Sequence, residues 1–155
     1  MVIHKIVSGG QTGADRAALD WAIARGIEHG GWCPAGRRAE DGAIPARYSL
    51  WQTPGRDYRQ RTKWNVRDSD ATLIITPSPE LTSGSLFTQE CARNLSRPYL
   101  HVHPCTMWRD WIRTFLGTNS IRVLNVAGPR GSSAKNMDTF VHEVLDEVLS
   151  NAARD

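Results

Sequence analysis

The chain has 155 residues, which suits a single domain that buries roughly two thirds of its unfolded surface in one core. Its formal charge is +3 and its pI about 9.0, but the basic residues are spread along the chain, which fits an anionic ligand and does not indicate nucleic-acid binding. The three cysteines lack the spacing of a metal site and are interpreted as reduced thiols. No basic-then-apolar leader follows Met1 and no apolar run reaches about 18 residues, so we expect a cytoplasmic protein that does not span a membrane.

The first predicted unit runs from residue 3 to residue 25. Residues 3–7 are typical of a short buried strand, the stretch SGGQTGAD at 8–15 of a glycine-rich turn, and residues 16–24 of an alanine-rich helix. A turn that leads from a strand into a helix start leaves backbone N–H groups unpaired, with the positive end of the helix dipole behind them. This arrangement favours an anion. The candidate binding residues here are Gly9, Gly10, Gln11, Thr12 and Gly13.

The rest of the chain alternates predicted strands and helices. We expect strands at residues 30–33, 71–76, 98–102 and 121–126, helices at 55–69, 84–95 and 106–116, an amphipathic C-terminal helix at about 134–151, and a long loop over 34–54. Alternation of this kind predicts an α/β fold, a single-domain three-layer sandwich over residues 1–155 with a mostly parallel sheet. Ligands of such sheets bind at the carboxyl ends of the strands.

Three loops should meet at that edge of the sheet. They are the first turn, residues 77–85 (PSPELTSGS) and residues 127–133 (AGPRGSS), and each offers small residues and hydroxyl groups. Ser83, Gly84, Ser85 and Arg130 are therefore candidate ligand contacts. The first turn lacks the Lys-Ser/Thr of a P-loop and the glycine spacing of a dinucleotide fingerprint. We expect a phosphorylated small-molecule ligand rather than nucleotide triphosphate hydrolysis, and no metal ligands are predicted.

Three polar residues near this edge have two readings each. Asp15 lies three positions after Thr12, the offset of a helix capping box, but it could also accept a hydrogen bond from a ligand. Arg61 and Asn65 lie on the polar inner face of the predicted helix at 55–69, and a buried polar face requires partners. Either a ligand or the neighbouring loops could supply those partners.

Several of these stretches together resemble the family of molybdenum cofactor carrier proteins within the lysine-decarboxylase-like Rossmann superfamily. The resemblance rests on SGGQTGADRAALDWA, WCPAGRRAEDGAIP, RTKWNVRDSDATLI and NVAGPRGS, which follow in this order, and it covers most of the chain from residue 6 to about residue 132. It implies a Rossmann-like fold, a homo-oligomer, and binding of molybdopterin, the phosphorylated pterin of the molybdenum cofactor, without chemical change. It also implies molybdoenzymes or cofactor-synthesis proteins as partners.

The same superfamily provides an alternative function. Its nucleoside-monophosphate phosphoribohydrolases share a PGGxGTxxE loop, and residues 82–90 (TSGSLFTQE) keep only its second glycine, Gly84, and its acid, Glu90. Under this reading the protein is a nucleotide-binding protein or an N-glycosidic hydrolase, with Glu90 as the candidate catalytic residue. The other reading of Glu90 is an exposed helical acid.

Overall fold

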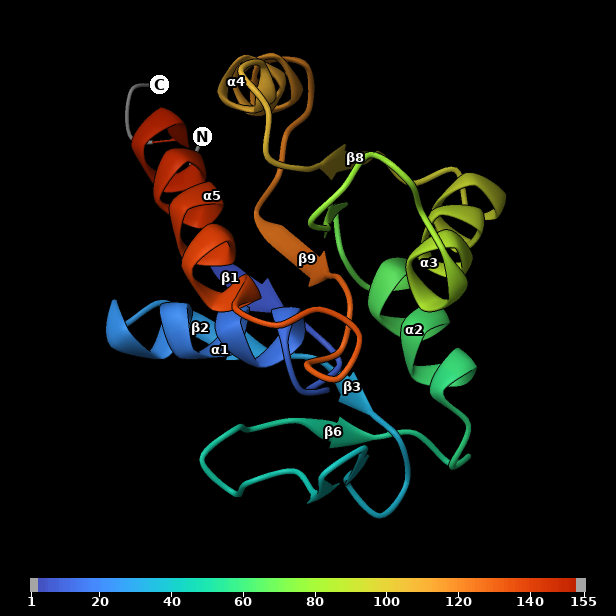
Figure 1. Ribbon diagram of the computed structural model, residues 1–155. Helices are drawn as coiled ribbons and strands as arrows, with labels where there is room; N and C mark the ends of the chain where they lie inside the picture. Colours follow the sequence, from blue (N-terminus) through green and yellow to red (C-terminus); the bar gives the residue numbers. More distant parts are fainter. Residues whose placement is uncertain (1–2, 153–155) are drawn as a thin grey trace.

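The computed structural model describes residues 3–152, and these residues form a three-layer α/β sandwich (Figure 1). Within them, five strands make a parallel sheet in the order β2-β1-β9-β7-β8. Their bounds are Lys5–Val7 (β1), Glu28–Gly30 (β2), Ala71–Ile75 (β7), Tyr99–Val102 (β8) and Val123–Ala127 (β9). The predicted Rossmann-like architecture is therefore confirmed. Residues 1–2 and 153–155 of the expected domain lie outside the described part.

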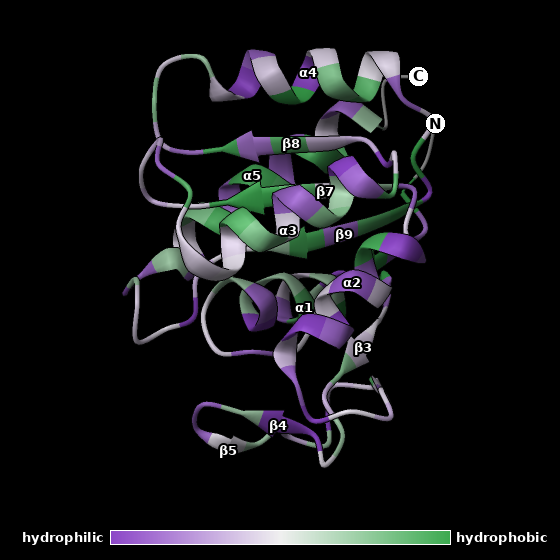
Figure 2. Cartoon of the chain, turned by 90° about the vertical axis from the view of Figure 1, so that its right-hand side faces the viewer, coloured by the Kyte–Doolittle hydropathy of each residue, from purple (hydrophilic) through white to green (hydrophobic). Residues whose placement is uncertain are grey.

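Helices cover both faces of this sheet, as Figure 1 shows. On one face lie α1 (Ala14–Ala24), α4 (Trp108–Thr118) and α5 (Met137–Ala152), and on the other lie α2 (Tyr58–Arg67) and α3 (Ser83–Asn94). All five residues of β7 are buried, because its alternate side chains enter the separate layers on its two faces. Figure 2 shows the apolar character of β7 and β9 against the polar surface of α2.

Residues 31–57 leave the sheet and form a segment that packs against α1 (Figure 1). The structure corrects the single strand expected at residues 30–33, because Gly31 has φ 124° and divides β2 from β3 (Trp32–Cys33). The predicted long loop also contains β4 (Arg38–Ala39), β5 (Gly42–Ala43) and β6 (Trp51–Gln52). β3 pairs with β6 in parallel, and β4 and β5 form an antiparallel hairpin. A small apolar cluster joins this segment to α1 through Leu19, Cys33, Ala39, Ile44, Tyr48 and Leu50.

The C-terminal helix begins at Met137, three residues later than predicted. Ala134 still belongs to the preceding turn, where its N–H donates to the carbonyl of Arg130, and Asn136 has φ 61°. Cys33, Cys91 and Cys105 are free thiols. Among residues 3–152, no helix combines the length and the apolar character needed to cross a bilayer.

Candidate functional site

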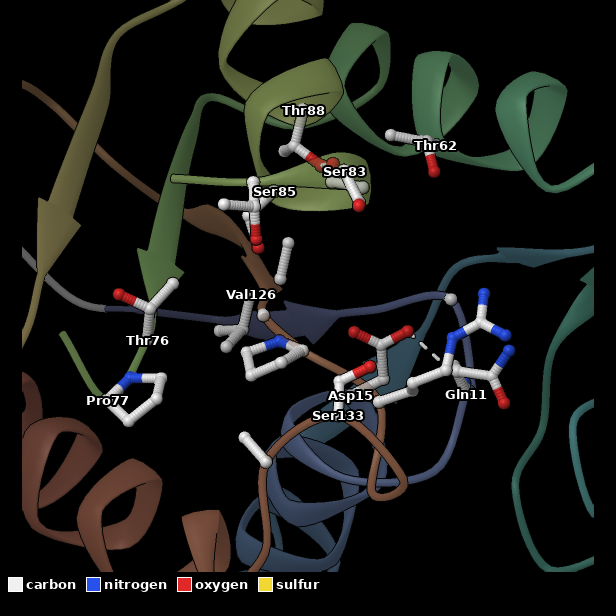
Figure 3. Close-up of a pocket in the computed structure, with 18 of the residues that line it drawn as sticks. Gln11, Asp15, Thr62, Thr76, Pro77, Ser83, Ser85, Thr88, Val126 and Ser133 are labelled. Carbon is white, nitrogen blue, oxygen red and sulfur yellow. Dashed lines mark hydrogen bonds between the residues drawn. The ribbon is translucent and has the colours of Figure 1, made fainter. Parts of the chain in front are cut away.

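A cavity of about 640 Å³ opens at the carboxyl ends of β1, β7 and β9. It is lined by residues from all three of the loops that were expected to meet there, together with the inner face of α2. Figure 3 shows Ser83 and Ser85 on the α3 side of the cavity, with Asp15 and Gln11 across from them. The convergence follows from the parallel sheet, in which every loop after a strand opens at the same edge.

The amides of the first loop are largely used inside the protein. The N–H of Gln11 donates to Asp15 Oδ2 at 3.2 Å, that of Thr12 to Gln11 Oε1 at 3.1 Å, and that of Gly10 to Ser8 Oγ at 3.4 Å. This corrects the expectation of a turn rich in unpaired amides. Neighbouring side chains supply acceptors that a reading of the backbone pattern alone does not count.

The predicted capping box is wrong. α1 has Gly13 as its N-cap and no side-chain capping hydrogen bond. The N–H of Ala14 instead donates to the carbonyl of Pro129 at 3.2 Å, while the Thr12 hydroxyl oxygen accepts from the N–H of Gly131 at 3.0 Å. A side chain at Gly13, where φ is +82°, would place its Cβ 2.5 Å from the Pro129 carbonyl oxygen. A carbonyl of the third loop thus accepts the hydrogen bond that a capping side chain would otherwise accept at the start of α1.

Asp15 and Arg61 form a buried ion pair at the side of the cavity. Asp15 is 6% exposed, and Arg61 Nη1 lies 3.3 Å from its Oδ2 and 2.8 Å from the carbonyl oxygen of Gly9. Burial raises the pKa of the Asp15 carboxyl, and the Arg61 charge and the amides of Gln11 and Gly9 oppose that rise. A Cβ on Gly9 would come within 1.9 Å of Arg61 Nη1, so this contact requires glycine.

Asn65 also lines the cavity, but its amide is occupied by a neighbouring strand. Its Oδ1 accepts from the N–H of Trp32 at 2.7 Å, and its Nδ2 donates to the carbonyl of Trp32 at 2.9 Å. Of the two readings, neighbouring loops supply the partners of Asn65. Arg61 binds the first loop through the Gly9 carbonyl and also lines the cavity, so its contact with a ligand stays a prediction.

An unforeseen carboxylate, Glu40 of the β4–β5 turn, binds the third loop. It accepts hydrogen bonds from the Ser132 N–H at 3.1 Å, the Ser132 hydroxyl at 2.6 Å and the Thr12 hydroxyl, and lies 3.9 Å from Arg130 Nη1. These hydrogen bonds, Ser132 first, lower the pKa of Glu40. The third loop does bind an anionic group, but that group is the carboxylate of Glu40 from the same chain. Glu40 stands in one of the motifs that resemble the carrier family, and that motif was the available signal.

The second loop leads into an open helix start. Thr82 is the N-cap of α3 but makes no side-chain capping hydrogen bond, and a Cβ added at Gly84 would meet nothing within 4 Å. Ser83 has φ 48°, and its hydroxyl and that of Ser85 line the cavity. The N–H of Ser85 donates to the carbonyl of Thr82 at 3.1 Å, so the open amides of this turn are those of Ser83 and Gly84, with the positive end of the α3 dipole behind them. Thr88 from the same helix and Asn125 from β9 extend this polar lining, and neither was predicted from the sequence.

A family model described as the circularly permutated YpsA SLOG family matches residues 6–149. The chain belongs to this family. A solved structure, that of a protein from Syntrophus aciditrophicus SB named "putative molybdenum carrier protein", is 42% identical and aligns over 96% of each chain with a TM-score of 0.89. These two findings confirm the resemblance seen in the sequence. No curated protein shows significant similarity to the chain.

In this member of the circularly permutated YpsA SLOG family, Glu90 does not line the cavity. It is exposed on α3 and is not among the lining residues, whereas Ser83, Gly84 and Ser85 at the start of the same helix are. The reading of Glu90 as an exposed helical acid is the one that the structure supports. The acid that the second loop brings to the cavity is Glu80, which is exposed.

The contacts of Glu40 predict a pH-dependent hairpin. Because its pKa is lower in the folded state than in the unfolded chain, its contribution is present above the ordinary carboxyl range and is lost as pH falls through the lowered pKa. We expect amide hydrogen exchange in residues 38–43, corrected for the intrinsic rate, to accelerate at acid pH. Glu40→Gln should show faster exchange already at neutral pH and little further change. Equal protection in both proteins at both pH values would contradict this role.

Proposed function

We propose that this protein binds a phosphorylated pterin of the molybdenum cofactor class and holds it without chemical change. One observation carries the proposal: of the three loops around the cavity, the second leaves a helix start open, while Asp15 and Glu40 fill the other two. The name of the solved relative, a molybdenum carrier, supports the choice of ligand.

The ligand phosphate would bind at the first turn of α3. There the N–H groups of Ser83 and Gly84 and the hydroxyls of Ser83 and Ser85 would donate to it, and the helix dipole favours a dianion. The first loop is less suited, because Asp15 already accepts from its Gln11 amide and Arg61 already binds its Gly9 carbonyl. Arg130 is engaged at 3.9 Å by Glu40 and contributes positive charge at the mouth. The phosphate-binding residues proposed here are fewer than those expected from the sequence. That expectation also included the first loop, with Gly9, Gly10, Gln11, Thr12 and Gly13.

The remainder of the cavity would hold the pterin. Its deep side carries the Asp15–Arg61 pair and Gln11, which are suited to hydrogen bonds with a polar ring rather than to a phosphate. As a carrier, the protein would work in the cytoplasm as a homo-oligomer and pass the cofactor to molybdoenzymes or receive it from cofactor-synthesis proteins. These further roles are part of the same proposal.

Anaerobic titration with the molybdenum cofactor tests the proposal directly. The expected result is saturable binding at micromolar protein, together with slower oxidation of the bound cofactor than of the free cofactor. In parallel, nucleoside monophosphates would be incubated with the protein and assayed for released base. Absence of saturable cofactor binding, or release of base at a catalytic rate, would contradict the carrier function.

A further inference from the structure

The side chain of Gln11 carries a hydrogen-bond donor that the protein does not use. Gln11 is 5% exposed and lines the cavity, and among the buried side-chain nitrogen and oxygen atoms of residues 3–152 its Nε2 is the one without a hydrogen-bond partner. Burying such a donor costs the free energy of its lost hydration, and native proteins rarely leave it unmet. The unmet donor indicates that an acceptor arrives from outside the chain.

The orientation of this amide is fixed by its other atom. Gln11 Oε1 accepts from the N–H of Thr12 at 3.1 Å and from the N–H of Glu40 at 2.9 Å. Rotating the amide by 180° would set its NH₂ group against two N–H donors, so Nε2 must be the atom left without a partner. The β4–β5 turn, which supplies the Glu40 amide, thereby locks the donor in place.

Asp15, which lines the same cavity, offers a hydrogen-bond acceptor. Asp15 Oδ2 receives the hydrogen bonds from the Gln11 N–H and from Arg61 Nη1, and neither of these bonds uses Oδ1. Figure 3 shows the Asp15 carboxylate directed into the cavity, next to Gln11. The cavity wall thus includes a fixed amide donor on Gln11 and, on Asp15, a carboxylate oxygen that neither of these two bonds uses.

We propose that Gln11 determines which ring the site accepts: Nε2 donates to a ring carbonyl or ring nitrogen, while Asp15 accepts from the N–H next to it. The inference rests on the proposed function and deepens it. The matching ligands are phosphorylated heterocycles with an acceptor beside an N–H, an edge that the pyrimidinone ring of a pterin carries. A phosphate without such a ring gains nothing from Gln11.

The test compares two probes, the phosphate monoester of 6-hydroxymethylpterin and inorganic phosphate. Gln11→Glu keeps the Oε1 acceptor and replaces the donor, whereas Gln11→Met removes both. Each variant should weaken pterin phosphate binding by about 10- to 100-fold and change inorganic phosphate binding by less than about twofold. Gln52→Glu is the matched control, because Gln52 Oε1 also accepts from a backbone N–H, that of Gly36, outside the cavity. It should bind like the unchanged protein.

A second measurement uses the unchanged protein and does not depend on the folding of a variant. In ¹⁵N-resolved NMR, the Gln11 side-chain NH₂ signal should shift on addition of the pterin ester and remain in place with inorganic phosphate. Unchanged pterin affinity in Gln11→Glu, or an equal shift with both probes, would overturn the role of Gln11 and leave the carrier function standing. If the unchanged protein does not bind the pterin ester, both proposals fail.

Discussion

Replacing Ser85 by aspartate is expected to weaken binding of a phosphorylated pterin by about 100-fold without unfolding the protein. Ser85 lies in the first turn of α3, and its side chain lines the cavity. A carboxylate there would repel the phosphate. For the free protein the change is favourable, because a negative charge in the first turn of a helix adds about 0.3–1 kcal/mol of stability. Calorimetric titration and thermal unfolding of the same preparation would measure both effects.

Thr139→Asp is the matched control for this substitution. Thr139 is exposed in the first turn of α5 and does not line the cavity, so the variant has the same change of charge and of helix dipole interaction. We expect it to bind the ligand like the unchanged protein. If both variants lose affinity equally, general electrostatics would explain the loss. If Ser85→Asp binds normally, the phosphate is not at α3.

Replacing Arg61 by methionine should give the largest loss of stability, about 3–5 kcal/mol in the free energy of unfolding. The change leaves the buried Asp15 carboxylate without its counter-charge and removes the hydrogen bond to the Gly9 carbonyl. Denaturant unfolding would measure the loss. Arg56→Met, which removes an arginine outside the cavity lining, is the control and should be nearly neutral.

The loss caused by Arg61→Met should depend on pH with a defined sign. Burial already raises the pKa of Asp15, and without Arg61 that pKa should rise further. A raised carboxyl pKa favours folding at low pH, and this contribution is lost as pH rises through the folded-state value. The variant should therefore be closer to the unchanged protein at pH 5 than at pH 8, and the added change Asp15→Asn should recover part of the loss. A loss independent of pH would contradict the account.

The sheet and the place of the cavity were predictable because they depend on local patterns. The apolar run of β7 and the glycine turns after β1 and β9 are visible in the sequence, and a parallel sheet then brings the following loops to one edge. The polar residues of the second loop could be named for the same reason. These residues line the cavity at the carboxyl end of β7, as expected for a parallel sheet.

The side chains that bind the first and third loops could not be predicted from the sequence, since they depend on tertiary contacts. Glu40 reaches Ser132 across 92 positions, through a hairpin inside a stretch whose glycines and prolines indicated only a loop. The spacing of Thr12 and Asp15 is compatible with a cap as well as with a ligand contact, and spacing alone does not show that Asp15 accepts from the N–H of Gln11. The break at Gly31 was missed because a single glycine in a short strand is compatible with either continuation or a kink.

A crystal structure with the phosphate ester of a pterin bound would show directly whether the phosphate lies at the start of α3. We expect the phosphate within hydrogen-bonding distance of the Ser83 and Gly84 amides and of the Ser85 hydroxyl. Glu40 should still be bound to Ser132, and the pterin ring should lie against Gln11 and Asp15. A phosphate seated on the third loop in place of the Glu40 carboxylate, or a ligand bound outside the cavity, would contradict this expectation.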